Sequence, residues 1–200
     1  LSVLAKPIFL QAFLPAACLF FLARWIRYPK GSRYFWRMVL AALPCAPLLL
    51  LQFYFYFAVG GSQTGMTVLL SWEKLRECAV GLLLMELFPL FALLTEREQK
   101  KEPLLTLTVL FNAVSFLEKL FFSEVGRRAD DGNFGWALFA GALMLWVVML
   151  PRFVRQFSEW RAQKTAVGGW RYRIGFPLLA YHLASGVYYI VYLLTTSNAL

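Results

Sequence analysis

The chain has 200 residues, of which 60% are apolar and only 16% are charged. Soluble domains contain roughly 45–50% apolar and about 25% charged residues, so the composition excludes an ordinary soluble domain of this length. The net charge of +9 is explained by basic loops that flank membrane helices, and we expect no nucleic-acid partner.

Six apolar runs divide the chain into segments that match the thickness of a membrane. A helix needs about 20 residues to cross the hydrocarbon core, whereas barrel strands would alternate in polarity over about ten residues. A helix also satisfies its own backbone hydrogen bonds in lipid. We therefore predict an all-α, polytopic transmembrane helix bundle that forms a single domain over residues 1–200. The predicted spans are 7–23, 38–59, 78–94, 104–122, 134–150 and 174–194.

The first run, 7–23, has the length of a signal peptide but not its charge pattern. Its basic residues follow the run, starting with Arg24 and Arg27, and no small-residue cleavage site comes after it. We expect a retained membrane helix. The chain begins with Leu1 and not with Met, so either an alternative start codon was read literally or an N-terminal segment is missing.

The second run, 38–59, contains two prolines, Pro44 and Pro47, on either side of Cys45. Proline lacks a backbone N–H and its ring collides with the preceding turn, so this pair predicts a kink or a local unwinding of the span. Broken helices line substrate sites in many transporters, but tolerated proline kinks are also common in membrane helices.

The segment between the second and third runs has an amphipathic pattern. From Met66 to Glu77, apolar residues fall at helical spacing on one side while charged residues occupy the other. This pattern predicts a helix that lies along the outer membrane surface before the third run enters the bilayer.

The third run, 78–94, carries Glu86 at its midpoint and Pro89 three residues later. A charge at the centre of a membrane helix costs about 2.5–3.5 kcal/mol on insertion scales, so such residues usually serve a purpose. Pro89 deprives the Met85 carbonyl of its usual donor and predicts a kink at this point. Two interpretations remain open, a site that handles a proton or cation and a protonated glutamic acid that binds a neighbouring helix.

The fourth run, 104–122, is the weakest, because only 14 residues precede the charged pair Glu118 and Lys119. Its alternative interpretation is a re-entrant or interfacial segment. The distribution of Lys and Arg favours a true span. If all six runs cross, fourteen of the 20 basic residues lie on one side, which predicts that both termini are outside.

The loop after the fifth run combines aromatic and basic residues. Phe153, Phe157 and Trp160 form a stripe at helical spacing that could lie on anionic lipid at the cytoplasmic face. The alternative is a plain basic linker that obeys the positive-inside rule. The basic residues assigned to this lipid contact are Arg152, Arg155, Arg161 and Lys164.

The last run, 174–194, contains His182, the single histidine of the chain, together with Ser185 and Tyr189 on the same helical face. Asn112 of the fourth run is a further polar residue within a predicted span. We predict that these residues and Glu86 form an intramembrane polar site that relays a proton or binds a cationic group. The alternative is that His182 only joins neighbouring helices by hydrogen bonds.

No residue pattern predicts an enzyme, a metal site or a cofactor. Cys18, Cys45 and Cys78 have neither a CxxC motif nor metal-ligand spacing, and we expect free thiols. The sequence favours a membrane transport protein or permease subunit in the plasma (cytoplasmic) membrane, with partner subunits or a homo-oligomer as further possibilities. The alternative is a non-transporting sensor, assembly partner or scaffold that acts through its basic cytoplasmic loops.

Overall fold

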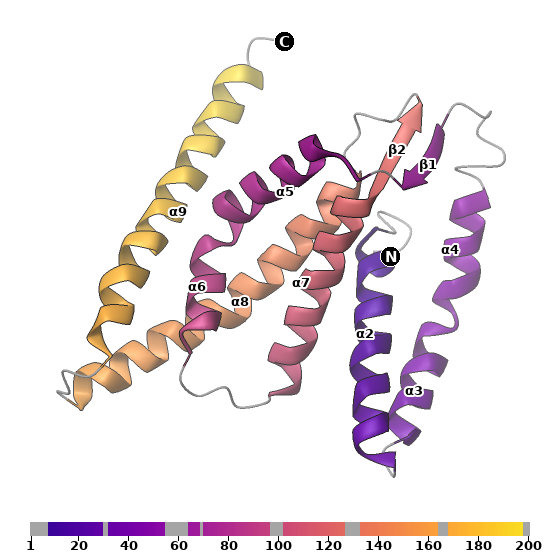
Figure 1. Ribbon diagram of the computed structural model, residues 1–200, viewed down its shortest axis with the longest axis horizontal. Coiled ribbons are helices and arrows are strands. Elements are labelled where there is room, and N and C mark those ends of the chain that lie inside the picture. Colours follow the sequence, from indigo (N-terminus) through magenta and orange to yellow (C-terminus); the bar gives the residue numbers. More distant parts are fainter. Residues whose placement is uncertain are drawn as a thin grey trace. The chain divides into compact units, whose positions relative to one another are not determined.

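The computed structural model describes residues 8–29, 32–54, 64–68, 70–96, 102–126, 133–163 and 168–197. Within these residues the chain forms eight helices and two short strands (Figure 1). The elements are α2 (Ile8–Arg27), α3 (Ser32–Ala42), α4 (Cys45–Phe53), β1 (Thr64–Val68), α5 (Trp72–Met85), α6 (Leu87–Leu94), α7 (Pro103–Phe121), β2 (Phe122–Gly126), α8 (Asn133–Ala162) and α9 (Gly169–Ser197).

Four helices are long and apolar enough to cross a membrane, namely α2, α7, α8 and α9. The successive helices α5 and α6 pass the same test together, which gives up to five spans among the described residues. The predicted helical, membrane-type architecture is therefore supported, and the protein has the helices of an integral membrane protein. The predicted number of about six spans and the predicted orientation are not confirmed.

The second predicted span, 38–59, is divided in the structure. α3 ends at Ala42 and α4 begins at Cys45, with Pro44 between them. Pro47 lies in the first turn of α4, where a helix does not need the backbone N–H that proline lacks. Residues 55–59 lie outside the described part of the chain, so the outer end of this run is not described.

A small antiparallel sheet replaces part of the predicted surface helix. The segment from Met66 to Val68 belongs to β1 and pairs with β2, so that Val68 lies opposite Phe122. The amphipathic helix begins only at Trp72, after the Ser71 hydroxyl accepts a hydrogen bond from the Lys74 backbone N–H at 3.2 Å. An N-cap of this kind fixes a helix start, and the extended residues before it gain their hydrogen bonds from β2.

The chain divides into two compact units, which are described separately. The first unit comprises Leu1–Cys78 and Lys101–Met144. In it, α2 packs against α7 and α3. A core of Ala12, Ala16, Phe111 and Ala137 joins α2 and α7 with the first part of α8. Membrane helices approach closely through small residues, because little hydrophobic force remains to drive association in lipid.

Gly141 marks a close approach of α8 to α7 in the first unit. A Cβ atom on Gly141 would lie 3.0 Å from the Asn112 Cα and 3.2 Å from the Ser115 Oγ. A larger residue would therefore push the two backbones apart.

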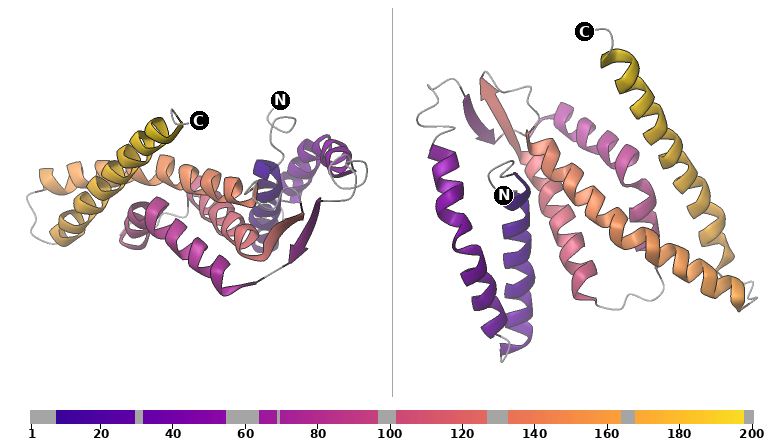
Figure 2. Two further views of the ribbon diagram at one scale, coloured as in Figure 1. Left: turned by 90° about the horizontal axis from the view of Figure 1, so that it is seen from above. Right: turned by 180° about the vertical axis from the view of Figure 1, so that it is seen from behind.

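The second unit comprises Ala79–Lys100 and Leu145–Leu200, and contains α6 together with α9 and the later part of α8. Phe88, Phe153 and Met149 are buried at its centre. The Phe153 ring lies 5.2 Å from the Phe88 ring and 5.6 Å from the Phe176 ring, so it joins α8 to both α6 and α9. Figure 2 shows α6 and α9 from two further sides.

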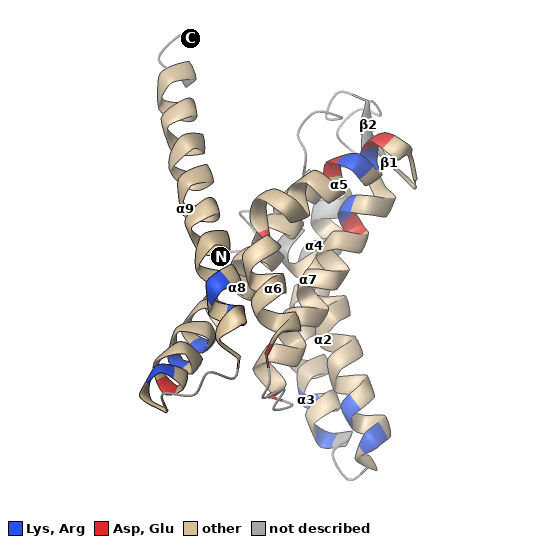
Figure 3. Cartoon of the chain, turned by 60° about the vertical axis from the view of Figure 1, so that its left-hand side comes forward, with Lys and Arg blue, Asp and Glu red and all other residues tan. Residues whose placement is uncertain are grey.

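Charged residues gather near the ends of the helices in both units. Figure 3 shows Lys and Arg at the start of α3 and towards the end of α8, with long uncharged stretches between. This distribution leaves the helix middles apolar, as a bilayer requires.

Candidate functional site

The third predicted span is broken at Glu86, where α5 and α6 meet at an angle of 75°. Glu86 has φ −125° and ψ −3°, outside the helical region. Its N–H still donates to the Leu82 carbonyl at 2.8 Å, and its carbonyl still accepts from the Leu90 N–H at 2.9 Å. The regular hydrogen bonds therefore continue up to the break on both sides, and the groups within it need other partners.

Trp146 supplies the partner for the carbonyl that Pro89 leaves without a donor. The indole Nε1–H of Trp146 donates to the Met85 carbonyl at 2.6 Å. The same indole stacks on the Phe88 ring, with centroids 5.0 Å apart and an interplanar angle of 28°. One side chain from α8 thus satisfies a backbone group that lipid could not satisfy.

His182 supplies the partner for a backbone donor on the other side of the break. The Phe88 N–H donates to the His182 Nε2 at 3.1 Å. In a continuous helix this N–H would donate to the Leu84 carbonyl, so the imidazole takes the place of that carbonyl as acceptor. The imidazole is thus inserted into one helical hydrogen bond, and insertion of a side chain is a recognised cause of sharp kinks.

The role of acceptor fixes the chemical form of the histidine. An imidazole nitrogen accepts a hydrogen bond only while it carries no proton, so the contact with Phe88 requires a neutral His182 with its proton on Nδ1. His182 is 9% exposed, and its ring packs edge-on against Trp146, with centroids 5.2 Å apart. Trp146 and His182 therefore support each other at the break.

Glu86 and His182 both lie at this break, as a carboxyl on the α5–α6 pair and an imidazole on α9. Glu86 is 1% exposed, and it precedes the first residue of α6 without capping that helix through its side chain. The polar contact that joins His182 to the segment is with the Phe88 backbone, two residues beyond Glu86. A buried carboxyl and an uncharged imidazole at one helix break can take up and release a proton, or receive a cation.

The other predicted site residues lie elsewhere. The Ser185 hydroxyl donates to the His182 carbonyl of its own helix at 3.0 Å, and Tyr189 is 60% exposed. Asn112 is buried in the first unit near Gly141, whereas Glu86 and His182 belong to the second unit. Of the predicted set, the described contacts bring only Glu86 and His182 to the same break.

Sequence reasoning missed Trp146. In the sequence, only the position of Trp146 could have indicated a role for this residue. Trp146 lies deep within an apolar run, whereas most tryptophans of membrane proteins lie at the interfaces. A tryptophan inside a span needs a hydrogen-bond acceptor for its indole N–H. The freed Met85 carbonyl was such an acceptor, but the two residues are 61 positions apart.

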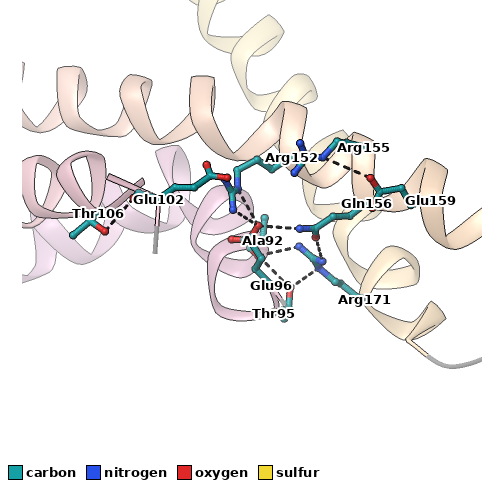
Figure 4. A network of polar contacts seen from close by, with 10 residues as sticks. All are labelled: Ala92, Thr95, Glu96, Glu102, Thr106, Arg152, Arg155, Gln156, Glu159 and Arg171. Atoms are coloured by element: carbon teal, nitrogen blue, oxygen red, sulfur yellow. Dashed lines mark hydrogen bonds and ion pairs between the residues drawn. The ribbon is translucent and has the colours of Figure 1, made fainter. Parts of the chain in front are cut away.

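A second polar cluster lies at the far end of α6 (Figure 4). The Glu96 carboxylate, whose side chain is fully buried, forms an ion pair with Arg152 of α8 at 2.8 Å. The same oxygen accepts a hydrogen bond from Gln156 Nε2 at 2.9 Å. Buried charges are retained when they are paired and hydrogen-bonded in this way.

Arg171 of α9 joins this cluster from the other side. Its guanidinium donates to the Ala92 carbonyl at 3.1 Å, to the Thr95 hydroxyl at 3.0 Å and to the Gln156 side-chain oxygen. The Ala92 carbonyl belongs to the last turn of α6, where carbonyls lack helical donors and the helix dipole favours a cation. Arg171 thus caps α6 while it lies 5.4 Å from the centre of the Phe153 ring.

The predicted lipid-binding stripe is largely internal. Phe153 is fully buried, Phe157 packs on Tyr172 at 5.1 Å, and the Arg152 side chain is 10% exposed in its ion pair. The physical reason is that the start of α9 meets α8 here, where the Tyr172 and Phe176 rings pack against Phe153 and Phe157. Arg155 and Arg161 are exposed, whereas Lys164 lies outside the described residues.

Comparisons of the chain with protein-family models, with curated proteins and with solved structures find no match. Among the described residues, no group of three or more His, Cys, Asp or Glu side chains is arranged to hold a metal ion.

Replacement of Trp146 by Phe tests the support of the break. The ring can still stack on Phe88, but the Met85 carbonyl loses its donor, so we expect the free energy of unfolding to fall by about 1–3 kcal/mol. Unfolding in detergent micelles measures the change. Trp136→Phe is the control, because Trp136 lies on the same helix and is 51% exposed. Equal stability of the two variants would contradict the assigned hydrogen bond.

Replacement of Arg152 by Ala tests the ion pair with Glu96. Loss of one partner of a buried pair typically costs about 3–5 kcal/mol of stability. Arg155→Ala is the matched control, since Arg155 lies on the same helix and forms an exposed pair with Glu159 at 3.8 Å. The control should lose less than about 1 kcal/mol. The contrary result is that both variants unfold like the wild type but bind anionic vesicles poorly. Arg152 would then be a lipid-binding residue, and the ion pair with Glu96 would not contribute to stability.

Proposed function

We propose that the chain is a multi-pass membrane transport protein, or the membrane subunit of a permease, that handles a proton or another small cation at the Glu86 break. The observation that carries this proposal is the insertion of His182 into the backbone of a broken apolar helix next to a buried carboxyl. In many transporters, interrupted membrane helices of this kind form the substrate or ion site.

Six spans with both termini on the outer side of the plasma (cytoplasmic) membrane are part of this proposal. The five spans that α2, α5–α6, α7, α8 and α9 can form would be completed by α3 and α4 as one span bent at Pro44. The excess of Lys and Arg in alternate loops supports the orientation.

The geometry suggests how proton binding would change the helix. A proton on the His182 Nε2 and the Phe88 N–H compete for the same nitrogen lone pair. Protonation at this atom therefore removes the acceptor, and Phe88 must find a new partner. A proton that moves between Glu86 and His182 would in this way be coupled to a rearrangement of the α5–α6 break.

A second candidate function is a non-transporting sensor, assembly partner or scaffold. The exposed positions of Arg155 and Arg161 favour it, because a basic surface near a membrane attracts anionic lipid. In that case the break would serve only to pack the helices, and loss of the Glu86 charge would leave proton permeability unchanged.

Proton uptake by proteoliposomes distinguishes these functions. A potassium diffusion potential, negative inside, drives protons inward, and a trapped pH-sensitive dye reports their entry. We expect the wild-type protein to conduct protons above the level of protein-free liposomes, and we expect Glu86→Gln to lower this rate by at least about tenfold, since the amide cannot carry a proton.

Two controls make the result specific. Glu159→Gln removes a carboxyl that is exposed on α8, and its rate should equal that of the wild type. Glu86→Gln must also elute and unfold like the wild type, which separates a loss of transport from a loss of folding. Wild-type liposomes without proton uptake, or an active Glu86→Gln variant, would refute proton transport by this chain at the Glu86 break.

A further inference from the structure

One face of α7 in the first unit carries a row of buried polar residues. Thr108, Asn112 and Ser115 are 2%, 8% and 0% exposed, and their spacing places them on the same side of the helix. Glu118 follows one turn later. The row lies within a candidate membrane span, Pro103–Phe121, so lipid supplies no hydrogen bonds to it.

The hydroxyl of Thr108 behaves differently from the other helical hydroxyls. Hydroxyls within membrane helices usually donate to a carbonyl of their own helix, and the Ser115 Oγ does so with the Phe111 carbonyl at 2.8 Å. The residues that also bond the carbonyl four positions earlier are Thr95, Thr106, Ser158, Thr195 and Thr196. The Thr108 Oγ1 is buried and has no hydrogen-bond partner among the described residues.

Two further polar atoms of this face share that property. The Asn112 Nδ2 and the Glu118 Oε2 are buried without a hydrogen-bond partner in the described part of the chain. A buried amide or hydroxyl without a partner costs at least about 1–3 kcal/mol, and more where only hydrocarbon surrounds it. A group that both donates and accepts hydrogen bonds would satisfy all three atoms.

We propose that this face of α7 binds a short chain of water molecules inside the membrane. Thr108 and Glu118 are ten residues apart, which is a rise of about 15 Å, or roughly half of a hydrocarbon core of about 30 Å. Water suits the donor amide, the hydroxyl and the carboxyl oxygen equally, and buried water typically occupies polar sites of this kind.

Gly141 of α8 packs against this face at its centre. A Cβ at this position would lie 3.0 Å from the Asn112 Cα and 3.2 Å from the Ser115 Oγ, so a residue without a side chain is needed for α8 to lie this close to the polar row. The hydration site belongs to the first unit and does not depend on the Glu86 break. The result of its test is therefore independent of the result for the transport proposal.

Cysteine accessibility tests the water chain. Cysteine at Thr108 or at Asn112 should react with a membrane-impermeant, cationic methanethiosulfonate reagent, because the reactive thiolate forms in water and not in lipid. Ala113→Cys is the control, since Ala113 is the neighbour of Asn112 and is exposed on the lipid-facing side of α7. Mass spectrometry of the labelled peptides separates the new thiol from Cys18, Cys45 and Cys78.

We expect Thr108→Cys and Asn112→Cys in lipid vesicles to be labelled at least about tenfold faster than Ala113→Cys. The Thr108→Cys variant keeps the side chain small and polar, so it serves if Asn112→Cys does not fold. If both buried positions react as slowly as Ala113→Cys, the face is dry and the inference is wrong. If Ala113→Cys reacts as fast as they do, water is not confined to this face and the inference is equally wrong.

Discussion

Inside a membrane, a backbone N–H or C=O group that leaves its helical hydrogen bond must find another partner within the protein. The rest of the second unit is arranged around this constraint at the α5–α6 break. Trp146 bonds the Met85 carbonyl and His182 bonds the Phe88 N–H, so α8 and α9 each contribute one side chain. Because the cost of an unpaired group in lipid is several kcal/mol, these two contacts fix the positions of their helices.

The short helix α6 is held by polar contacts at both ends. At its start, His182 accepts the hydrogen bond that a side-chain cap would otherwise accept. At its end, Arg171 bonds the Ala92 carbonyl and Glu96 pairs with Arg152. Eight residues of helix have little stability of their own, so these contacts determine where α6 lies. A change of protonation at the break therefore acts on the start of α6, while Arg171 and the Glu96–Arg152 pair hold the end of that helix.

The sequence predicted the elements of this site better than their partners. Apolar runs and prolines indicate where helices form and break, and the loss of a donor for Met85 follows from Pro89 alone. Which side chain replaces that donor depends on tertiary packing, which one sequence does not contain.

Arg152 shows the same limit of prediction from one sequence. A basic residue after an apolar run predicts a cytoplasmic loop, and only the fold places Glu96 beside it. The strand β1 was missed because Met66 to Val68 are only three residues. So short a segment of the apolar pattern does not distinguish a helix from a strand that pairs with β2.

The central claim is that His182 occupies the place of a helical hydrogen bond. Solid-state NMR of the labelled protein in lipid bilayers tests it directly, through the coupling across the hydrogen bond between the Phe88 amide and the His182 imidazole. The account predicts a measurable coupling to Nε2, with this nitrogen unprotonated and the proton on Nδ1. A protonated Nε2, or a Phe88 amide bonded to the Leu84 carbonyl as in a continuous helix, would contradict it.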